Sequence, residues 1–364
     1  MTVAVLPAAA LSAGAALSAL PARATTPAPA SHTRSRVPRS PGRLLGQRIM
    51  VGFPGTTPTR SLLNRVRTGQ VGAVILFSYN ISSGSQVRDL TRTLQRAARA
   101  GRNPPLLIAV DQEGGQVKRF PDGPPFLSPP EIAHQGCRPA HRQGRLTGAY
   151  LKDRGVNMDL APVVDVPTYS GAFIWQQGRA FSFRANTVTK CATGFALALQ
   201  SAGVAATGKH FPGVGSAGVD TDNQLDELHP TRKQRRQALL PYRALIARGL
   251  DAVMLSTAGF PAYDPSGTPT ALSRRMIGGL LRKRLGFDGV TITDALESPT
   301  GHDKLTAGVL AARAGADILL YTEAATGELD RLKSAFRTGH IRRADAVASY
   351  ERIVALKRRV GLSR

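Results

Sequence analysis

Polar residues that could carry chemistry follow the apolar runs of this 364-residue chain at several points. The clearest case is KHFPGVG at residues 209–215, where Lys209 and His210 follow the apolar run GVAAT after one glycine. The glycines that follow let the backbone approach a ligand closely, and loops at strand ends commonly carry binding residues. Acidic residues end other apolar runs, as at Asp111 and Asp294. This combination predicts a polar-ligand site lined mainly by carboxylates.

The elements that must position these residues alternate between short apolar runs and longer helical patterns from about residue 47 onward. Such alternation predicts a parallel sheet built from strand–helix units. Eight strands are expected, at 48–53, 72–77, 106–110, 157–166, 204–209, 252–256, 289–293 and 317–321. Helices are expected at 86–100, 187–201, 232–248, 273–284 and 343–359. Eight alternations favour an α/β fold of the (β/α)8 TIM-barrel type, in a single domain, over a doubly wound open sheet.

A barrel of this kind places its active site at the carboxyl ends of the strands, so polar residues there are expected to converge on one face. The residues that follow the third to seventh expected strands fit this rule. They are Asp111 and Glu113, Asp165, Lys209 and His210, Ser256 and Thr257, and Asp294. A purely structural role would scatter such residues over both ends of the strands. Their clustering favours a catalytic mouth.

Acidic residues dominate this mouth, and the signatures of several other chemistries are absent from the sequence. There is no Cys/His metal-ligand spacing, no GxxxxGK(S/T) phosphate loop and no GxSxG elbow. No metal or organic cofactor is therefore expected. A carboxylate-lined mouth suits glycoside cleavage, in which one carboxylate attacks or stabilises the anomeric carbon and a second group protonates the leaving oxygen. The expected substrate is a carbohydrate.

Five segments of the chain resemble the motifs of one known family. They are AVDQEGGQVKRF at 109–120, NMDLAPVVDV at 157–166, GRAFSF at 178–183, KHFPGVG at 209–215 and LGFDGVTITDAL at 285–296. In this order they are similar to the family 3 glycoside hydrolases, and most of all to the single-barrel β-N-acetylhexosaminidases. The likeness runs from about residue 46 to 325.

The resemblance implies roles for individual residues. The family's nucleophile corresponds to Asp294, and an Asp at a strand end can stay ionised near its ordinary pKa of about 3.9 and attack an anomeric carbon. The alternative for this residue is a helix N-cap, since an Asp ahead of a helix also serves as a cap. Asp111 corresponds to the Asp that hydrogen-bonds sugar hydroxyls. Lys209 and His210 correspond to the pair that holds the same ring, and Arg179 to the Arg of the family's RSF segment.

Three assignments stay open at this point. His210 either binds the ring or is a histidine packed and satisfied beneath the loop. Arg119, which is also in the family pattern, either joins the binding residues or braces Asp111 or Glu113 from behind. Asp165 lies either in the substrate pocket or beneath it.

The loop after KHFPG departs from the hexosaminidase pattern, in which a GHG sequence is followed by an Asp-Ser-His group whose His is the general acid/base. Here the stretch reads GVGSAGVDTDN, so Val214 replaces the first His, Asp220 keeps the Asp, and Asp222 stands in place of the catalytic His. In one interpretation Asp222 is itself the acid/base, with its pKa raised by burial or by Asp220. In the other, efficient protonation is lost and sugar binding or slow hydrolysis remains. Glu227 and His229 are spare candidates for proton transfer.

Other departures lie near the same pocket. Thr257 stands where a His is usual, Gln116 where an Arg is common, and Arg184 where an acid usually follows the RSF segment. Each change removes or reverses a polar contact, so the resemblance leaves the preference for an N-acetyl sugar open.

The amino terminus predicts secretion. Residues 1–24 are rich in Ala and Leu and end in a small-x-small pattern, which is typical of a signal peptide, while 25–43 read as a disordered basic linker before a barrel at 44–364. The apolar part of the leader is too broken to span a membrane. Cys137 and Cys191 fit either one disulfide of an oxidising compartment or two unpaired thiols.

The formal net charge is +24, which would favour any polyanion, including an anionic cell-wall polymer. The basic residues are spread along the whole chain, and the sequence has no helix-turn-helix, zinc-finger or aromatic RNA-binding signature. We therefore expect no nucleic-acid partner, and an ordinary solvated basic surface is the alternative to polymer binding.

Together these observations predict a secreted, retaining glycoside hydrolase that removes a terminal β-linked sugar, N-acetylglucosamine, in cell-wall turnover. Asp294 is the expected nucleophile, and Asp222 and Asp220 supply acid/base function. The ring-binding residues are expected to be Asp111, Arg119, Arg179, Lys209 and His210. The alternative is a catalytically impaired sugar- or cell-wall-binding protein on the same barrel.

Overall fold

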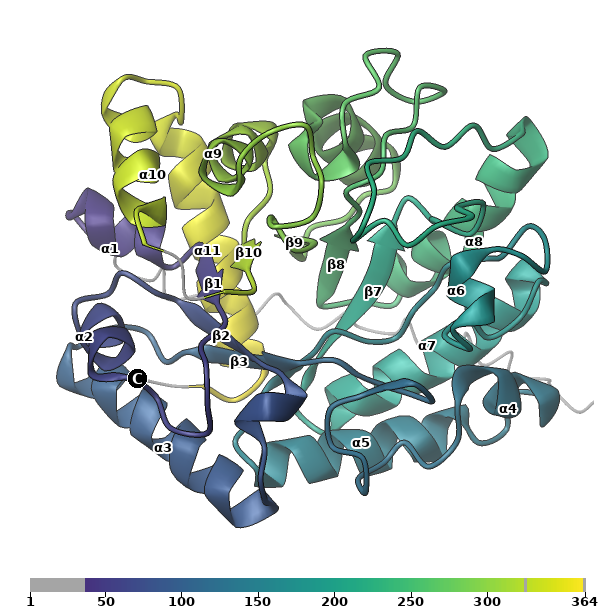
Figure 1. The fold of residues 1–364 in the computed structure, drawn as a ribbon, viewed down its shortest axis with the longest axis horizontal. Helices are drawn as coiled ribbons and strands as arrows, with labels where there is room; N and C mark the ends of the chain where they lie inside the picture. Colours follow the sequence, from purple (N-terminus) through teal and green to yellow (C-terminus); the bar gives the residue numbers. More distant parts are fainter. Residues whose placement is uncertain (1–36, 324–325, 363–364) are drawn as a thin grey trace, which may run out of the picture. The chain divides into compact units, whose positions relative to one another are not determined.

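A computed structural model describes residues 37–323 and 326–362. Eight parallel strands form one sheet (Figure 1), in the order β10-β1-β2-β3-β6-β7-β8-β9. A bridge between Ile292 and Ile318 joins its two edges. The strands are β1 Ile49–Val51, β2 Ala73–Leu76, β3 Leu107–Val110, β6 Met158–Asp159, β7 Ala205–Phe211, β8 Ala252–Leu255, β9 Val290–Thr293 and β10 Leu319–Tyr321. The predicted (β/α)8 barrel is confirmed.

The strands bury two separate sets of apolar side chains, because successive residues of a strand point to opposite faces. On β2, Ile75 lies in the barrel interior, while Val74 and Leu76 pack against the surrounding helices. The interior set also includes Ile353 and Leu356 of the last helix, α11 Arg343–Arg359, which closes the amino-terminal end of the barrel. The opposite, carboxyl-terminal end is left for the loops.

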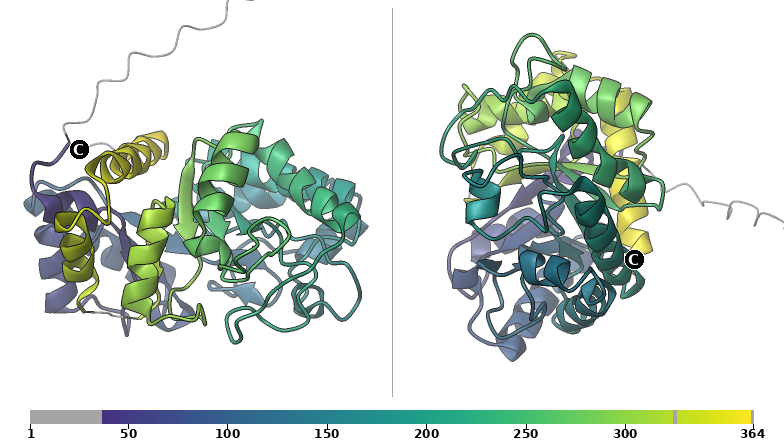
Figure 2. Two further views of the ribbon diagram at one scale, coloured as in Figure 1. Left: turned by 90° about the horizontal axis from the view of Figure 1, so that it is seen from above. Right: turned by 90° about the vertical axis from the view of Figure 1, so that its right-hand side faces the viewer.

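Helices cover the outside of the barrel between the strands (Figure 2). The other helices are α1 Pro41–Gly46, α2 Arg60–Arg67, α3 Gly84–Ala100, α4 Pro129–His134, α5 Ala140–Asp153, α6 Phe173–Gln176, α7 Ala185–Ser201, α8 Arg232–Ile246, α9 Lys304–Ala314 and α10 Glu328–Arg337, with short 3-10 turns η1 Ser78–Asn80 and η2 Thr270–Leu272 and a π-helix, η3 Arg275–Arg284. Side-chain caps begin several of them, as where Ser83 accepts from the Gln86 N–H at 3.1 Å.

The fourth barrel strand is shorter than the run 157–166 predicts. Only Met158–Asp159 form a ladder, and Val163 adds one isolated bridge to Lys209. Pro162 interrupts the ladder, since proline has no N–H to donate. A small antiparallel hairpin, β4 Gln112–Gly114 with β5 Val117–Lys118, follows β3 and carries the chain over the mouth.

Cys137 and Cys191 form a disulfide with a Cα–Cα distance of 4.8 Å. It ties the connection between α4 and α5 to the second turn of α7. Of the two alternatives that the sequence left open, the bonded pair is therefore the one found.

The predicted leader 1–24 and most of the predicted linker 25–43 lie outside the described residues. Helix α1 begins at Pro41, so the folded part includes the last residues of the stretch assigned to the linker. None of the helices within the described part of the chain is long and apolar enough to cross a membrane.

Candidate active site

A cavity of about 360 Å³ lies at the carboxyl ends of the barrel strands. Apolar residues of the barrel interior form its floor, among them Ile75, Leu160, Met254 and Leu320. The structure brings all eight predicted site residues to its wall, namely Asp111, Arg119, Arg179, Lys209, His210, Asp220, Asp222 and Asp294. These residues come from five different loops or strand ends, so the barrel topology is what assembles them.

Lys209, at the end of β7, lies between two carboxylates. Its Nζ is 2.7 Å from Asp111 Oδ1 and 2.7 Å from Glu113 Oε1. Glu113 is also held by Arg179, whose Nε and Nη2 donate to its two oxygens at 2.8 and 2.9 Å. Burial alone would raise the pKa of Glu113, but the two cations bring it down to about 2. Glu113 therefore stays ionised, and it fixes Lys209 and Arg179 in place.

Asp111 is the more accessible of the two carboxylates in this cluster, with a side chain that is 12% exposed against 1% for Glu113. Burial acts to raise its pKa, yet the Lys209 ammonium and the Arg119 guanidinium lower it below the ordinary value. Arg119 Nη2 lies 3.3 Å from Asp111 Oδ2, so of the two carboxylates it was expected to brace, Arg119 contacts Asp111. An ionised carboxylate held in this way can accept hydrogen bonds from two neighbouring sugar hydroxyls.

His210 is oriented by Asp165, a fully buried residue below the cavity. The imidazole Nδ1 is 2.7 Å from Asp165 Oδ2, and the same carboxylate accepts from the backbone N–H groups of His210 and Val214. Burial opposes protonation of the imidazole, but the adjacent carboxylate raises the pKa of His210. The other ring nitrogen, Nε2, lies 3.4 Å from Arg179 Nη2 on the cavity wall. Asp165 thus lies beneath the pocket rather than in it.

Asp294 follows β9 and is 8% exposed at the cavity wall. Its Oδ1 accepts from the backbone N–H of Ala295 at 3.0 Å. Burial, together with the negative charge of Asp222, raises the pKa of Asp294 to about 7. The expectation of a value near 3.9 is therefore wrong. The helix-cap alternative is also wrong, because α9 begins ten residues later and Asp303 caps it.

Asp220 and Asp222 lie on the loop between β7 and α8, which is tied down at several points. Asp220 Oδ2 accepts from Gln177 Nε2 at 2.9 Å, and its Oδ1 accepts from the backbone N–H of Asp222 at 3.1 Å. Ser298, on the loop that carries Asp294, donates to Asp222 Oδ1 at 3.0 Å. Thr257 donates to the carbonyl of Thr221, next to Asp222, at 3.0 Å.

Asp222 is exposed, so the burial that one of the sequence-based interpretations considered is not found. The carboxyl with a pKa near neutrality is Asp294 instead. The sequence-based hypothesis assigned the desolvated carboxyl to Asp222, whereas in the structure it is Asp294. Both still line one cavity, and the charge of one affects the protonation of the other.

Two residues that support this site were not predicted from the sequence, namely Gln177 and Ser298, the partners of Asp220 and Asp222. The sequence also did not predict that Glu113 holds Lys209 and Arg179 in place. Glu113 was noticed for its place after a strand, but no signal pointed to the other two, because their contacts join loops distant in sequence. Glu227 and His229, the spare proton donors, do not line the cavity.

Among the described residues, no three or more His, Cys, Asp or Glu side chains are arranged to hold a metal ion. The site instead combines a carboxylate near its point of ionisation, a second carboxylate within electrostatic reach, and a fixed array of ionic hydrogen-bonding groups. On the carboxyl-terminal face of a TIM barrel, these features define the active site of a glycoside hydrolase.

Comparisons with known sequences agree with this class. The glycosyl hydrolase family 3 N terminal domain matches residues 44–356. An uncharacterized secreted glycosyl hydrolase of Arthroderma benhamiae is 37% identical over 335 residues, which cover 86% of this chain and 92% of the relative. A beta-hexosaminidase of Nitrosomonas eutropha is 36% identical over 258 residues, covering 68% of this chain and 72% of the relative. This chain belongs to glycosyl hydrolase family 3.

Solved structures show the same relationship. A family 3 beta-N-acetylglucosaminidase from Paenibacillus superposes with a TM-score of 0.82 at 34% identity, covering 88% of this chain and 62% of that chain. A beta-N-acetylhexosaminidase from Beutenbergia cavernae gives 0.79 at 28% identity, covering 88% of this chain and 99% of that one. The present chain thus spans about three fifths of the first of these structures and nearly all of the second.

Proposed function

We propose that this protein removes a terminal β-linked N-acetylglucosamine residue by a retaining mechanism, with Asp294 as the nucleophile. The observation that carries the proposal is that Asp294 and Asp222 line the same cavity as the cluster of Asp111, Lys209 and Arg179. The names of the related β-hexosaminidases support the choice of sugar.

The cluster of Asp111, Lys209 and Arg179 binds and orients the sugar ring. Asp111 accepts from vicinal hydroxyls, while Lys209 and Arg179 present donors whose positions are already fixed by Glu113. Such preorganised groups lose little conformational freedom when the ring arrives, so binding energy is kept for orienting the anomeric carbon toward Asp294.

The first chemical step forms a bond between an Asp294 oxygen and the anomeric carbon while the glycosidic bond breaks. Asp222 gives its proton to the leaving oxygen, so that oxygen departs as a neutral hydroxyl. The negative charge of Asp294 is lost in the ester, and Asp222 carries the negative charge instead once it has given up its proton.

In the second step Asp222, now ionised, takes a proton from water as the water oxygen attacks the anomeric carbon. The ester bond breaks, Asp294 regains its charge, and two inversions give net retention of configuration. Asp220 positions Asp222 through the hydrogen bond to its backbone N–H, and Ser298 orients the carboxylate.

The direct test of the nucleophile is to trap the covalent intermediate. Incubation with a slow fluorinated N-acetylglucosaminide should add one glycosyl unit to the intact protein, and peptide mapping should place it on Asp294. The Asp294→Asn protein should bind the sugar without an adduct. If the native protein binds the ligand and gives no adduct, the noncatalytic sugar-binding alternative stands instead.

The acid/base role of Asp222 has its own test. The Asp222→Ala enzyme should hydrolyse an aryl glycoside with a good leaving group slowly, and azide should accelerate turnover and yield a β-glycosyl azide, because azide needs no general base. The matched control is Asp226→Ala, since this acid lies on the same loop but not on the cavity. If Asp222→Ala keeps normal activity and azide accelerates neither variant, Asp222 has no role in the mechanism.

Secretion and a role at the cell wall are part of the same proposal. The leader-like residues 1–24, the disulfide and the description of one relative as secreted support export. Fractionation of the source cells tests it, with the expected result that the mature chain begins near residue 25 and is recovered outside the cytoplasm. Recovery of the unprocessed chain from the cytoplasm would contradict it.

A further inference from the structure

A second cleft of about 400 Å³ lies between α8 and η3, outside the barrel wall. Five arginines line it, together with Leu239, Leu240, Ala262 and Tyr263. The arginines are Arg232, Arg235, Arg236, Arg243 and Arg284. No acidic side chain is among the described residues that line this arginine cleft.

The arrangement of these arginines follows from α8. Arg232, Arg236 and Arg243 recur at helical spacing, so they project from one face, and all three are exposed. None of them makes a side-chain hydrogen bond or ion pair with the described residues. Arg235 is more confined, because its Nη1 donates to the Pro230 carbonyl at 3.0 Å and its guanidinium lies 5.8 Å from the Tyr263 ring centroid.

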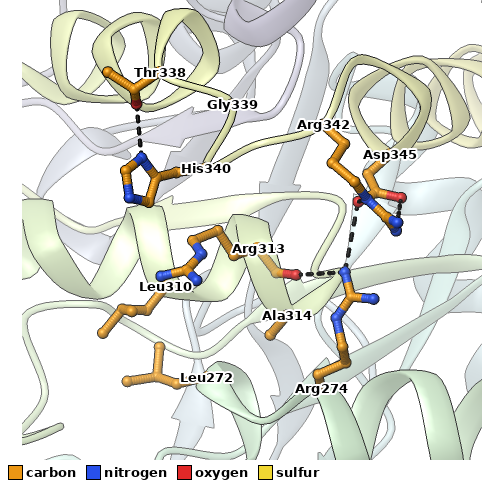
Figure 3. A pocket seen from close by; sticks show the side chains of 10 residues that line it. All are labelled: Leu272, Arg274, Leu310, Arg313, Ala314, Thr338, Gly339, His340, Arg342 and Asp345. Carbon is orange, nitrogen blue, oxygen red and sulfur yellow. Dashed lines mark hydrogen bonds and ion pairs between the residues drawn. The ribbon is translucent and has the colours of Figure 1, made fainter.

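A larger basic pocket elsewhere provides a comparison, because two of its arginines pair with a carboxylate (Figure 3). That pocket, about 690 Å³, also contains three arginines, but a carboxylate lies among them. Asp345 pairs with Arg342 at 2.8 Å and lies 3.6 Å from Arg274, which also donates to the Arg313 carbonyl at 3.2 Å. The arginine cleft has five guanidinium groups and no such acid, so its charge is available to a ligand.

The position of the arginine cleft indicates what the ligand is. Helix α8 begins at Arg232, directly after the loop that carries Asp220 and Asp222. A polymer that lies along the first turns of α8 would therefore reach the region of the active-site mouth. Tyr263 and the 40% exposed Leu240 add apolar surface, which suits the C–H face of a sugar ring.

We propose that the arginine cleft binds an acidic glycan, whose carboxylate or phosphate groups pair with the guanidinium groups while its chain extends toward the catalytic mouth. Guanidinium groups bind both kinds of anion in a bidentate manner. The choice of a glycan over other polyanions rests on the proposed function, because it depends on a sugar-cleaving site beside the cleft.

The test measures binding of fluorescently labelled oligogalacturonate and of a phosphorylated mannan oligosaccharide to the full chain by anisotropy. Dextran of equal length is the neutral control. The double variant Arg236→Ala/Arg243→Ala should bind at least one acidic glycan at least about tenfold more weakly, as expected for the loss of charge-assisted hydrogen bonds. Its kcat/KM on a small aryl N-acetylglucosaminide should remain that of the wild type.

The matched control removes the same charge from α3, between β2 and β3, where the barrel order places it opposite α8 (Figure 1). The Arg96→Ala/Arg99→Ala variant should keep its affinity within about twofold, a small change on the scale of one hydrogen bond. Equal weakening in both double variants would mean that diffuse surface charge is responsible and would overturn the proposal. Binding of dextran as strong as that of both acidic glycans would do the same.

A DNA duplex serves as the competing class of polyanion. If it binds as tightly as the acidic glycans and loses as much affinity in Arg236→Ala/Arg243→Ala, the arginine cleft is a general polyanion site and the glycan assignment fails. The two proposals fail in distinguishable ways. A protein that binds the acidic glycan through α8 but turns over no aryl glycoside keeps the cleft and loses the enzymatic function.

Discussion

Each end of the barrel contains a buried carboxylate, but the two carboxylates differ in how many partners they have. At the amino-terminal end, Asp317 is fully buried and accepts from Arg282 and Arg352 at 2.7 Å each and from the Thr291 N–H at 2.9 Å. At the carboxyl-terminal end, Asp294 accepts one backbone hydrogen bond, from Ala295, and otherwise faces the cavity.

The pKa values follow from these surroundings. Burial acts to raise the pKa of both acids, but Arg352 and Arg282 lower that of Asp317 below its ordinary value, whereas Asp222 raises that of Asp294 further, to about 7. A carboxylate whose hydrogen bonds are complete stabilises the fold. One that is desolvated, close to a like charge and open to a cavity is destabilising, and such sites are typically functional.

The largest expected effect is a loss of activity on replacing Asp294, at the carboxyl-terminal end of the barrel. Replacing Asp294 with Asn should lower kcat on an aryl glycoside by at least about a thousandfold, because the nucleophile is lost. The free energy of unfolding should stay the same or rise at pH 7, since an unfavourable buried charge is removed. Steady-state kinetics and urea unfolding on one preparation measure both. An Asn variant that is inactive only because it is unfolded would count against the assignment.

The opposite result is expected for Asp317→Asn. It leaves Arg282 and Arg352 without a carboxylate, and breaking such a buried pair costs about 3–5 kcal/mol. Urea unfolding should show that loss, while kcat per folded molecule stays within about twofold, the scale of a minor perturbation. The exposed Asp330, which pairs with Lys333, is the control, and its Asn variant should change stability by less than about 1 kcal/mol.

The disulfide between Cys137 and Cys191 is a covalent contact that should affect stability and not activity. Cys137 and Cys191 are 54 residues apart and lie outside the cavity, so the Cys137→Ser/Cys191→Ser protein should lose about 2–4 kcal/mol of stability through the greater entropy of its unfolded chain. The activity of the folded fraction should be unchanged. Thermal unfolding with and without reductant measures the effect, and a variant as stable as the oxidised wild type would show that the pair contributes nothing.

The raised pKa of Asp294 should make both the stability and the activity of the protein depend on pH. Its folded pKa of about 7 lies above the unfolded value of about 3.9, so from about pH 4 to 7 the folded protein keeps a proton that the unfolded chain has lost. The stability of the wild type should therefore fall relative to Asp294→Asn as pH rises through that window. The kcat/KM of the wild type should fall below about pH 7, because the nucleophile must be ionised.

Urea titrations of both proteins at pH 4, 5.5 and 7 provide the measurement of stability. Parallel curves for wild type and Asp294→Asn would mean that the pKa of Asp294 is the same in the folded and unfolded states. The pH–rate profile would then have to be explained by another group.

The sequence was sufficient to predict the barrel and the placement of most site residues, since both depend on local patterns. Runs such as 72–77 and 289–293 identify strands, and residues directly after a strand, such as Asp111 and Asp294, must lie at the mouth. Pro162 explains why the fourth strand is shorter than its apolar run.

The features of the site that the sequence did not predict depend on contacts between loops that are distant in sequence. The hydrogen bonds from Gln177 to Asp220 and from Ser298 to Asp222 join segments more than 40 residues apart. The raised pKa of Asp294 likewise requires the folded position of Asp222, which no spacing in the sequence fixes. The exposure of Asp222, which differs from the burial considered in one interpretation, likewise depends on the folded position of its loop.

The smallest expected effect concerns the positioning of Asp222. Ser298 is buried and donates to Asp222 Oδ1, so Ser298→Ala should lower kcat about fivefold, as expected for one partly exposed hydrogen bond worth about 1 kcal/mol. Because Ser298 does not line the cavity, KM should change little. Thr300→Val is the control, since this hydroxyl donates to the His302 carbonyl on the same loop. A structural role alone would lower the melting temperature and the kcat of both variants equally. A positioning role should lower kcat in Ser298→Ala alone, because only that variant loses the hydrogen bond to the Asp222 carboxylate.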